Sequence, residues 1–169
     1  AFSRAADGEA NVLKNNTIGN KDGWLYRKDK NLIFRADLRK SMQCTDPGFI
    51  YGISCTCCDV ANHNYLLDLL KTDRSHMTFS NMWVNANYPL FKEHFFKTLK
   101  AANKNIVICT NKKAKIRNLA AYFPVKDFIP IPGNCVTYWE KNRDYIRGLL
   151  DLHGSTRENT IFLFAAGPL

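Results

Sequence analysis

The sequence lacks long hydrophobic runs: no apolar stretch in its 169 residues approaches the roughly 18 residues that a membrane-spanning helix needs. It also lacks an initiator methionine, a charged-then-apolar leader, an internal repeat and a low-complexity tract. Hydrophobic residues still make up 46% of the chain, enough for a proper core. We therefore predict one globular domain over residues 1–169, without a transmembrane segment. Because the chain opens inside a predicted strand and stops at Gly167-Pro168-Leu169, where a helix should begin, we expect a piece of a longer protein.

Two nucleotide-binding motifs are absent. No Gly-x-x-x-x-Gly-Lys-Ser/Thr loop occurs, which argues against a P-loop kinase or ATPase. Gly-x-Gly-x-x-Gly is missing as well, which argues against a dinucleotide-dependent oxidoreductase.

Acidic residues are scarce, with 15 against 24 basic residues and a net charge of +9. This balance favours an anionic partner, such as nucleotide phosphates, nucleic acid or an acidic membrane surface. The basic residues are spread over predicted helix faces and one loop, a distribution typical of a solvated exterior. We therefore do not expect a dedicated nucleic-acid site.

Cysteines number six, but the chain is not small and Cys109 sits inside an apolar strand pattern. A disulfide framework is therefore less consistent with the sequence than reduced thiols. Reduced thiols predict a cytoplasmic location.

Apolar segments of two periods alternate along the chain. Nearly continuous or short apolar runs predict strands at 1–2, 49–53, 76–79, 106–109, 128–131 and 161–165. Apolar residues at helical spacing predict helices near 10–14, 33–42, 66–70, 91–99, 113–122 and 136–149. This order predicts an α/β fold, a Rossmann-like three-layer domain whose mostly parallel sheet carries helices on both faces.

Polar residues follow the predicted strands at their carboxyl ends, where open parallel sheets bind ligands. The candidate binding residues there are Asn81, Asn85, Asn87, Thr110, Asn111, Asn134 and Gly167. Amide and hydroxyl groups can hydrogen-bond to ribose, base edges or sugar hydroxyls, and backbone amides at a helix start attract phosphate. The same residue types satisfy the backbone of ordinary turns, so each also admits a structural role.

Two carboxylates flank a glycine near the N-terminus, in Arg4-Ala5-Ala6-Asp7-Gly8-Glu9. Gly8 permits a sharp turn, so we expect Asp7 and Glu9 to converge on one point. Carboxylate oxygens in that arrangement suit a hard divalent cation, Mn²⁺ or Mg²⁺. Alternatively, Asp7 caps the following helix and Glu9 complements its dipole. Arg4 either donates to phosphate or pairs with Glu9.

The same hexapeptide is similar to the Arg-aromatic-Gly-Asp-Gly-Glu signature of the GT-D type glycosyltransferases, with Ala6 where the family usually has glycine. The closing Ala165-Ala166-Gly167-Pro168 and the order of elements between also resemble that family. The resemblance implies a transferase that moves sugar from a nucleotide-diphosphate sugar donor to a glycan or glycoconjugate acceptor. It implies that Asp7 and Glu9 serve the cation that holds the diphosphate, with Arg4 and Gly8 in the donor site.

A general base would be needed for the acceptor hydroxyl in an inverting mechanism. The candidates are Asp59, His63 and Glu140, and the sequence does not choose among them. His63 is more typical of a surface or capping histidine than of a catalytic base.

A cysteine cluster, Cys55-Thr56-Cys57-Cys58, supports a different hypothesis. Clustered thiols can hold Zn²⁺, although two well-separated Cys-x-x-Cys elements are absent. Alternation in an extended segment places Cys55 and Cys57 on one side, whereas buried or loop thiols are the other interpretation. The alternative function is thus a non-catalytic Rossmann-like binding module, with or without cysteine-bound zinc.

Overall fold

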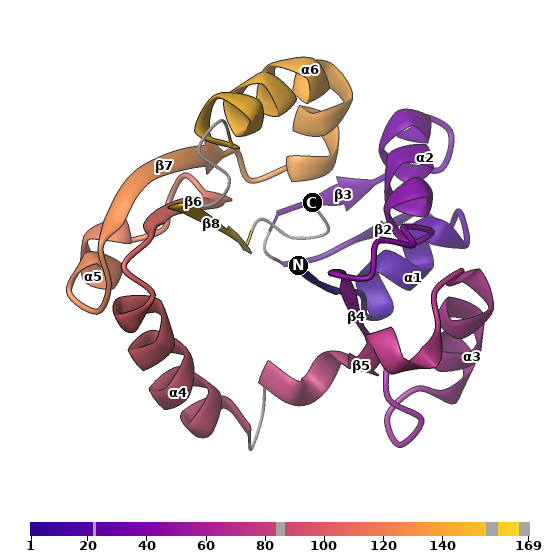
Figure 1. The fold of residues 1–169 in the computed structure, drawn as a ribbon. Coiled ribbons are helices and arrows are strands. Elements are labelled where there is room, and N and C mark those ends of the chain that lie inside the picture. The colour runs from indigo at the N-terminus through magenta and orange to yellow at the C-terminus, as the bar shows by residue number, and fades with distance from the viewer. Residues whose placement is uncertain (22, 84–86, 155–158, 166–169) are drawn as a thin grey trace. The chain divides into compact units, whose positions relative to one another are not determined.

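The structure, a computed structural model, describes residues 1–21, 23–83, 87–154 and 159–165 (Figure 1). Its elements are β1 (Phe2–Arg4), α1 (Asp7–Leu13), β2 (Ile18–Gly19), β3 (Leu25–Tyr26), α2 (Leu32–Ser41), β4 (Ile50–Ile53), α3 (Val60–Leu69), η1 (Arg74–His76), β5 (Met77–Phe79), η2 (Ser80–Trp83), α4 (Tyr88–Ala101), β6 (Asn105–Asn111), α5 (Ile116–Ala120), β7 (Val125–Ile131), α6 (Cys135–Gly154) and β8 (Thr160–Ala165). Here η marks a 3₁₀ helix. The predicted α/β class is confirmed.

The chain forms two compact units, each with its own parallel sheet. The first unit comprises Ala1–Ile18 and Tyr26–Phe91, and the second comprises Gly19–Leu25 and the described residues from Lys92 to Ala165. The strand order is β1-β4-β5 in the first unit and β7-β6-β8 in the second, with all neighbours parallel. The sequence predicted one sheet, whereas the strands divide between these two sheets and the two-stranded sheet β2-β3.

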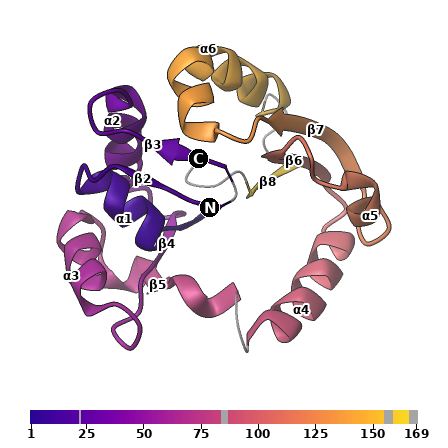
Figure 2. The same cartoon turned by 180° about the vertical axis from the view of Figure 1, so that it is seen from behind.

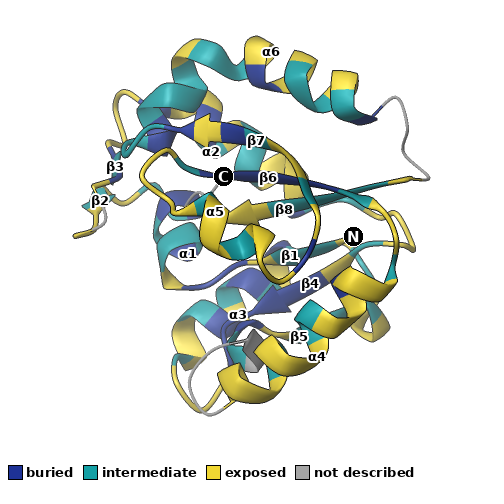
Figure 3. Ribbon diagram, turned by 90° about the vertical axis from the view of Figure 1, so that its left-hand side faces the viewer, coloured by how far each residue is buried: buried dark blue, intermediate teal, exposed yellow. Residues whose placement is uncertain are grey.

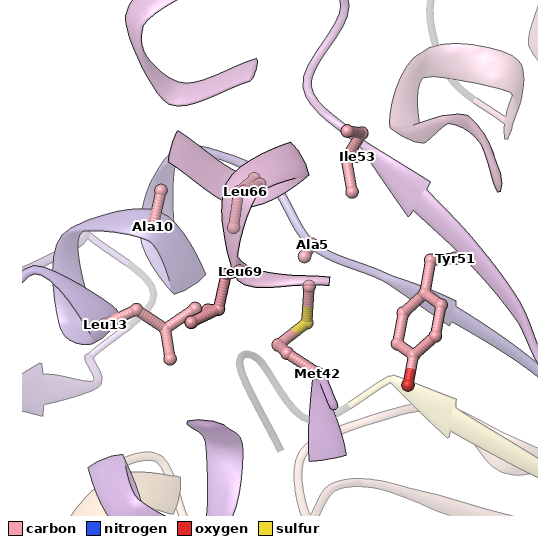
Figure 4. Packing of buried hydrophobic residues seen from close by; sticks show 8 residues of the cluster. All are labelled: Ala5, Ala10, Leu13, Met42, Tyr51, Ile53, Leu66 and Leu69. Atoms are coloured by element: carbon pink, nitrogen blue, oxygen red, sulfur yellow. The ribbon is translucent and has the colours of Figure 1, made fainter. Parts of the chain in front are cut away.

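The core of the first unit lies between its helices and one face of its sheet. Tyr51 and Ile53 alternate with Gly52 along β4, so both point to the same face. They pack there against residues from α1, the end of α2, and α3 (Figure 4). The cluster consists of Ala5, Ala10, Leu13, Met42, Tyr51, Ile53, Leu66 and Leu69. This arrangement explains why α3 carries leucines at both positions 66 and 69.

Gly52 faces the opposite side of β4, where it lets a ring approach. A Cβ at this position would lie 2.7 Å from Cζ of Phe2 on the neighbouring strand β1. Only a residue without a side chain leaves room for this ring in its present position. The glycine therefore serves close packing between β1 and β4.

The sheet of the second unit carries helices on both faces, as predicted. Leu99 of α4 and the partly buried Leu119 of α5 pack with Ile106 and Ile108 of β6. In the strand order β7-β6-β8, the connection through α5 runs from β6 to β7. The connection through α6 runs back from β7 past β6 to β8, which is the opposite direction across the sheet. Right-handed crossovers therefore place α5 and α6 on opposite faces, which Figure 2 shows.

Burial follows the same layers within each unit. The inner residues of β4 and β6 are buried, whereas the outward positions of α4 are exposed to solvent (Figure 3). Sequence periodicity identified these strands because buried parallel strands are apolar on both faces.

The polar segment between the predicted helices near 10–14 and 33–42 contains a strand that the sequence did not predict. The polar segment 20–30 includes β3, and Tyr26 is fully buried, with its hydroxyl donating to Oδ1 of Asn15 at 2.6 Å. Trp24 is buried as well. Because turn residues surround these aromatics, the sequence pattern did not predict the short strand.

Candidate functional site

The candidate site lies at the carboxyl edge of the β1-β4-β5 sheet. Because the strands are parallel, the segments that follow them meet at one edge. Beyond β1, the Ala5 amide continues the pairing by donating to the Gly52 carbonyl at 2.7 Å, and α1 begins two residues later. The loop 54–59 follows β4, and η2 follows β5.

The two carboxylates of the N-terminal motif lie in the first turn of α1. Gly8 is helical, so the sharp turn predicted from the sequence is absent and α1 starts at Asp7. Residues two apart on a helix point to different sides. The helical backbone therefore does not by itself bring Asp7 and Glu9 together, and the convergence of their carboxylates on one point stays a prediction.

Glu9 stabilises the helix start. Its Oε2 accepts a hydrogen bond from the Ala6 amide at 2.8 Å, which satisfies one backbone donor left over at the N-terminus. Ala6 has no side-chain oxygen to return the bond, so only this half of a capping box exists. Asp7 is exposed, and its carboxylate accepts no hydrogen bond from the described residues.

Arg4 ties β1 to the segment after β5. Its Nε donates to the Ser80 carbonyl at 3.0 Å, and among the described residues no ion pair joins it to Glu9. One guanidinium donor is thus used for structure. The terminal nitrogens at this exposed residue make no hydrogen bond to described residues.

The three thiols after β4 converge. The Sγ atoms of Cys55 and Cys57 are 2.8 Å apart, those of Cys57 and Cys58 are 3.6 Å apart, and all three lie within 4.8 Å of one another. The segment is a turn rather than an extended strand, closed by the Cys58 amide donating to the Cys55 carbonyl at 3.3 Å. This turn brings in Cys58, which alternation along an extended chain did not predict. None of the six cysteines, which all lie among the described residues, forms a disulfide.

The thiols perturb one another. Hydrogen bonds from Cys57 and then Cys58 hold the pKa of Cys55 below its ordinary value. The reciprocal hydrogen bonds to Cys55 and Cys57 raise the pKa of Cys58 to about 12. Proximity therefore favours a single thiolate shared within the cluster over several separate charges.

The candidate base Asp59 caps α3. Its Oδ1 accepts from the Asn62 amide at 3.0 Å, and its Oδ2 accepts from the Asn62 side chain at 2.5 Å. Lys14 then donates to Oδ1 of Asn62 at 2.5 Å, which links the end of α1 to α3. Both carboxylate oxygens of Asp59 are thus occupied by structural contacts.

His63 is buried beneath the cysteine turn. Because the Ser54 carbonyl can only accept, Nδ1 of His63 carries the proton and donates to it at 2.7 Å. The ring also lies beside Phe79, with centroids 6.2 Å apart. Its contact holds the backbone next to Cys55, so the surface role considered from the sequence does not apply.

The asparagines after β5 contact one another and the thiols. Nδ2 of Asn81 lies 3.6 Å from Sγ of Cys55, and the Asn81 carbonyl accepts from Nδ2 of Asn87 at 3.4 Å. Asn85 and Gly167, two further candidate binding residues, lie outside the described residues. Asn81 is therefore the predicted amide that the structure brings to the cysteine turn.

The remaining candidates belong to the second unit. Oγ1 of the buried Thr110 donates to the Ala165 carbonyl at 2.6 Å, and Oδ1 of Asn111 accepts from the Lys113 amide at 2.9 Å. Asn134 caps α6 by accepting from the Thr137 amide at 3.1 Å. Glu140 is half-buried on α6. Three of these four thus make contacts that shape strand and helix ends.

Sequence reasoning missed Ser54, Ser80 and Asn62, which support the site through two carbonyls and a bridging amide. Serines directly after apolar strands could have been noticed. Their contacts are made by backbone carbonyls, however, and any residue type provides a carbonyl.

Comparisons of the chain with protein-family models, with curated proteins and with solved structures find no match. Among the described residues, none of the helices combines the length and apolar character needed to cross a membrane.

Proposed function

We propose that this chain is a metal-dependent glycosyltransferase domain that transfers a sugar from a nucleotide-diphosphate sugar to a glycan or glycoconjugate acceptor. The observation that carries the proposal is the position of the Arg4–Glu9 motif. It begins at the last residue of a parallel strand and continues into α1, at the sheet edge where α/β folds bind ligands. The exposed Asp7 carboxylate lies at that edge without a protein partner among the described residues.

Asp7 and Glu9 would hold Mn²⁺ or Mg²⁺. Glu9 uses Oε2 for the helix start, and its Oε1 accepts no hydrogen bond from described residues. Both ions prefer such carboxylate oxygens and keep positions for phosphates. When bound, the cation would supply Lewis-acid stabilisation of the departing diphosphate. Arg4 would donate to phosphate from its terminal nitrogens while Nε keeps its contact with Ser80.

The test is calorimetric titration of UDP and GDP in the presence of Mn²⁺ and again with excess chelator. Asp7→Asn should weaken the Mn²⁺-dependent binding at least about tenfold, because it removes a charged ligand while keeping the size. Glu9→Gln should also weaken binding but keep the helix start, since an amide oxygen can accept from Ala6. The matched control is Asp68→Asn, an exposed acid on α3.

A folded wild-type chain that binds neither nucleotide with Mn²⁺ would overturn this proposal. Equal binding by wild type and Asp7→Asn would overturn the assignment of the metal ligand.

A non-catalytic binding module is the second candidate, and the capping roles of Glu9 and Asp59 favour it. In this case the carboxylates serve the fold alone. It predicts that Asp7→Ala combined with Glu9→Ala leaves ligand binding unchanged, whereas Cys57→Ser or Cys58→Ser disrupts it.

A further inference from the structure

We propose that Cys55, Cys57 and Cys58 form a three-thiolate site for a thiophilic metal ion at the carboxyl end of β4. The site is separate from the carboxylates of α1 and does not depend on the glycosyltransferase proposal. Its ligands come from one turn of four residues, two of them exposed and one buried.

The sulfur positions fit one ion. Sulfurs bound tetrahedrally at about 2.3 Å from Zn²⁺ lie about 3.8 Å apart. Cys57 and Cys58 are at 3.6 Å, and the full set spans at most 4.8 Å. The 2.8 Å contact between Cys55 and Cys57 must open by about an ångström. Rotation of the exposed Cys57 side chain can provide that movement, because staggered rotamers of a surface side chain interconvert easily.

The turn is anchored at both ends before any ion binds. At its start, buried His63 holds the Ser54 carbonyl at 2.7 Å. At its end, the Asp59 amide donates to the Cys55 carbonyl at 3.0 Å, and the Asp59 side chain caps α3. Ligands held by supporting contacts lose less freedom on binding, which raises affinity.

Asn81 supports the sulfur of the buried ligand. Its Nδ2 lies 3.6 Å from Sγ of Cys55 and comes from η2, on a different segment of the first unit. An N–H group directed at sulfur stabilises the thiolate form that a metal requires. Asn81 is therefore a positioning residue rather than a ligand.

The ligand chemistry selects the ion. Three sulfurs and no carboxylate make up the cluster among the described residues, so soft cations such as Zn²⁺ and Cu⁺ are favoured over Mg²⁺ and Mn²⁺. Three protein ligands suit trigonal Cu⁺ directly. For Zn²⁺ they leave a fourth position for water or an exchangeable ligand.

The test measures Zn²⁺ and Cu⁺ affinities of the reduced, metal-free protein by competition with chromophoric chelators. We expect one equivalent to bind. Cys57→Ser and Cys58→Ser should each lose more than about 100-fold, because they remove ligands, and changes to supporting residues alone cost about 10–100-fold. Asn81→Ala should lose about tenfold. Cys44→Ser, a half-buried cysteine outside the cluster, is the matched control.

Circular dichroism verifies that the serine variants fold, which we expect because both cysteines are exposed. Co²⁺ spectra count the thiolates independently, through the intensity of sulfur-to-metal charge transfer. Tighter Zn²⁺ binding assigns the four-coordinate form, and tighter Cu⁺ binding the trigonal form.

Undiminished binding by the doubly substituted Cys57→Ser/Cys58→Ser chain, or no binding of either ion by wild type, would overturn the site. Asp7→Asn should keep full affinity, so this result is separable from nucleotide binding.

Discussion

At the scale of single residues, the structure shows how a buried polar group is satisfied in an apolar cluster. The Tyr51 hydroxyl donates to the Ser41 carbonyl at 2.6 Å and lies 3.2 Å from the Cys44 carbonyl. Burial, with the nearby Cys44, raises the Tyr51 pKa from 10.0 to about 12. The hydroxyl thus joins the end of α2 to β4 as a neutral donor.

We predict that Tyr51→Phe lowers the free energy of unfolding at pH 8 by about 1–3 kcal/mol, because the part-buried Ser41 carbonyl loses its donor. The folded pKa lies above the unfolded one, so this contribution is present below pH 10 and is lost as pH rises towards 12. The difference between wild type and variant in urea unfolding should therefore shrink between pH 8 and pH 11. Tyr145→Phe, at an exposed site on α6, is the control. An unchanged difference at pH 11 would contradict the assignment.

At the scale of elements, α3 is held by its cap and by its buried leucines. Asp59 begins the helix, and Leu66 is fully buried among residues of α1, α2 and β4. Propensity alone seldom maintains a helix of this length in water, so packing supplies most of its stability.

Leu66→Ala should lower the free energy of unfolding by about 2–5 kcal/mol, since it removes apolar contacts and leaves a cavity. Leu32→Ala on α2, where the leucine is 57% exposed, should change it by no more than about 0.5 kcal/mol. Urea denaturation followed by circular dichroism compares the two. A loss below about 1 kcal/mol for Leu66→Ala would mean that the cluster collapses around the missing side chain.

At the scale of the whole molecule, the charge of +9 acts through its distribution. Basic residues spread over several faces attract polyanions through charge, and this attraction does not depend on the base sequence of a nucleic acid. We expect binding to a single-stranded oligonucleotide to weaken steeply with salt and to show no preference among base sequences. Fluorescence anisotropy at low and at physiological salt tests this expectation. A sequence preference that persists at physiological salt would contradict the view that the charge is a solvated exterior.

Much of the fold followed from local pattern. The runs at 49–53 and 106–109 predicted β4 and β6, and helical spacing at Phe34, Leu38 and Met42 predicted α2. The sequence did not predict β3, because the aromatic residues there are surrounded by turn residues. The division of the strands among separate sheets was not predicted either, because strand pairing depends on contacts between distant segments.

The sequence by itself determined most of the strands and helices, because burial on one face or two imposes a period on the residues. It also placed polar residues and cysteines at strand ends. Only the tertiary structure decided which of these side chains lie close to one another. The backbone at Gly8 is helical rather than sharply turned, and the turn after β4 brings Cys58 to Cys55. Side-chain convergence depends on backbone dihedrals and on partners from other elements, and residue spacing along the chain specifies neither.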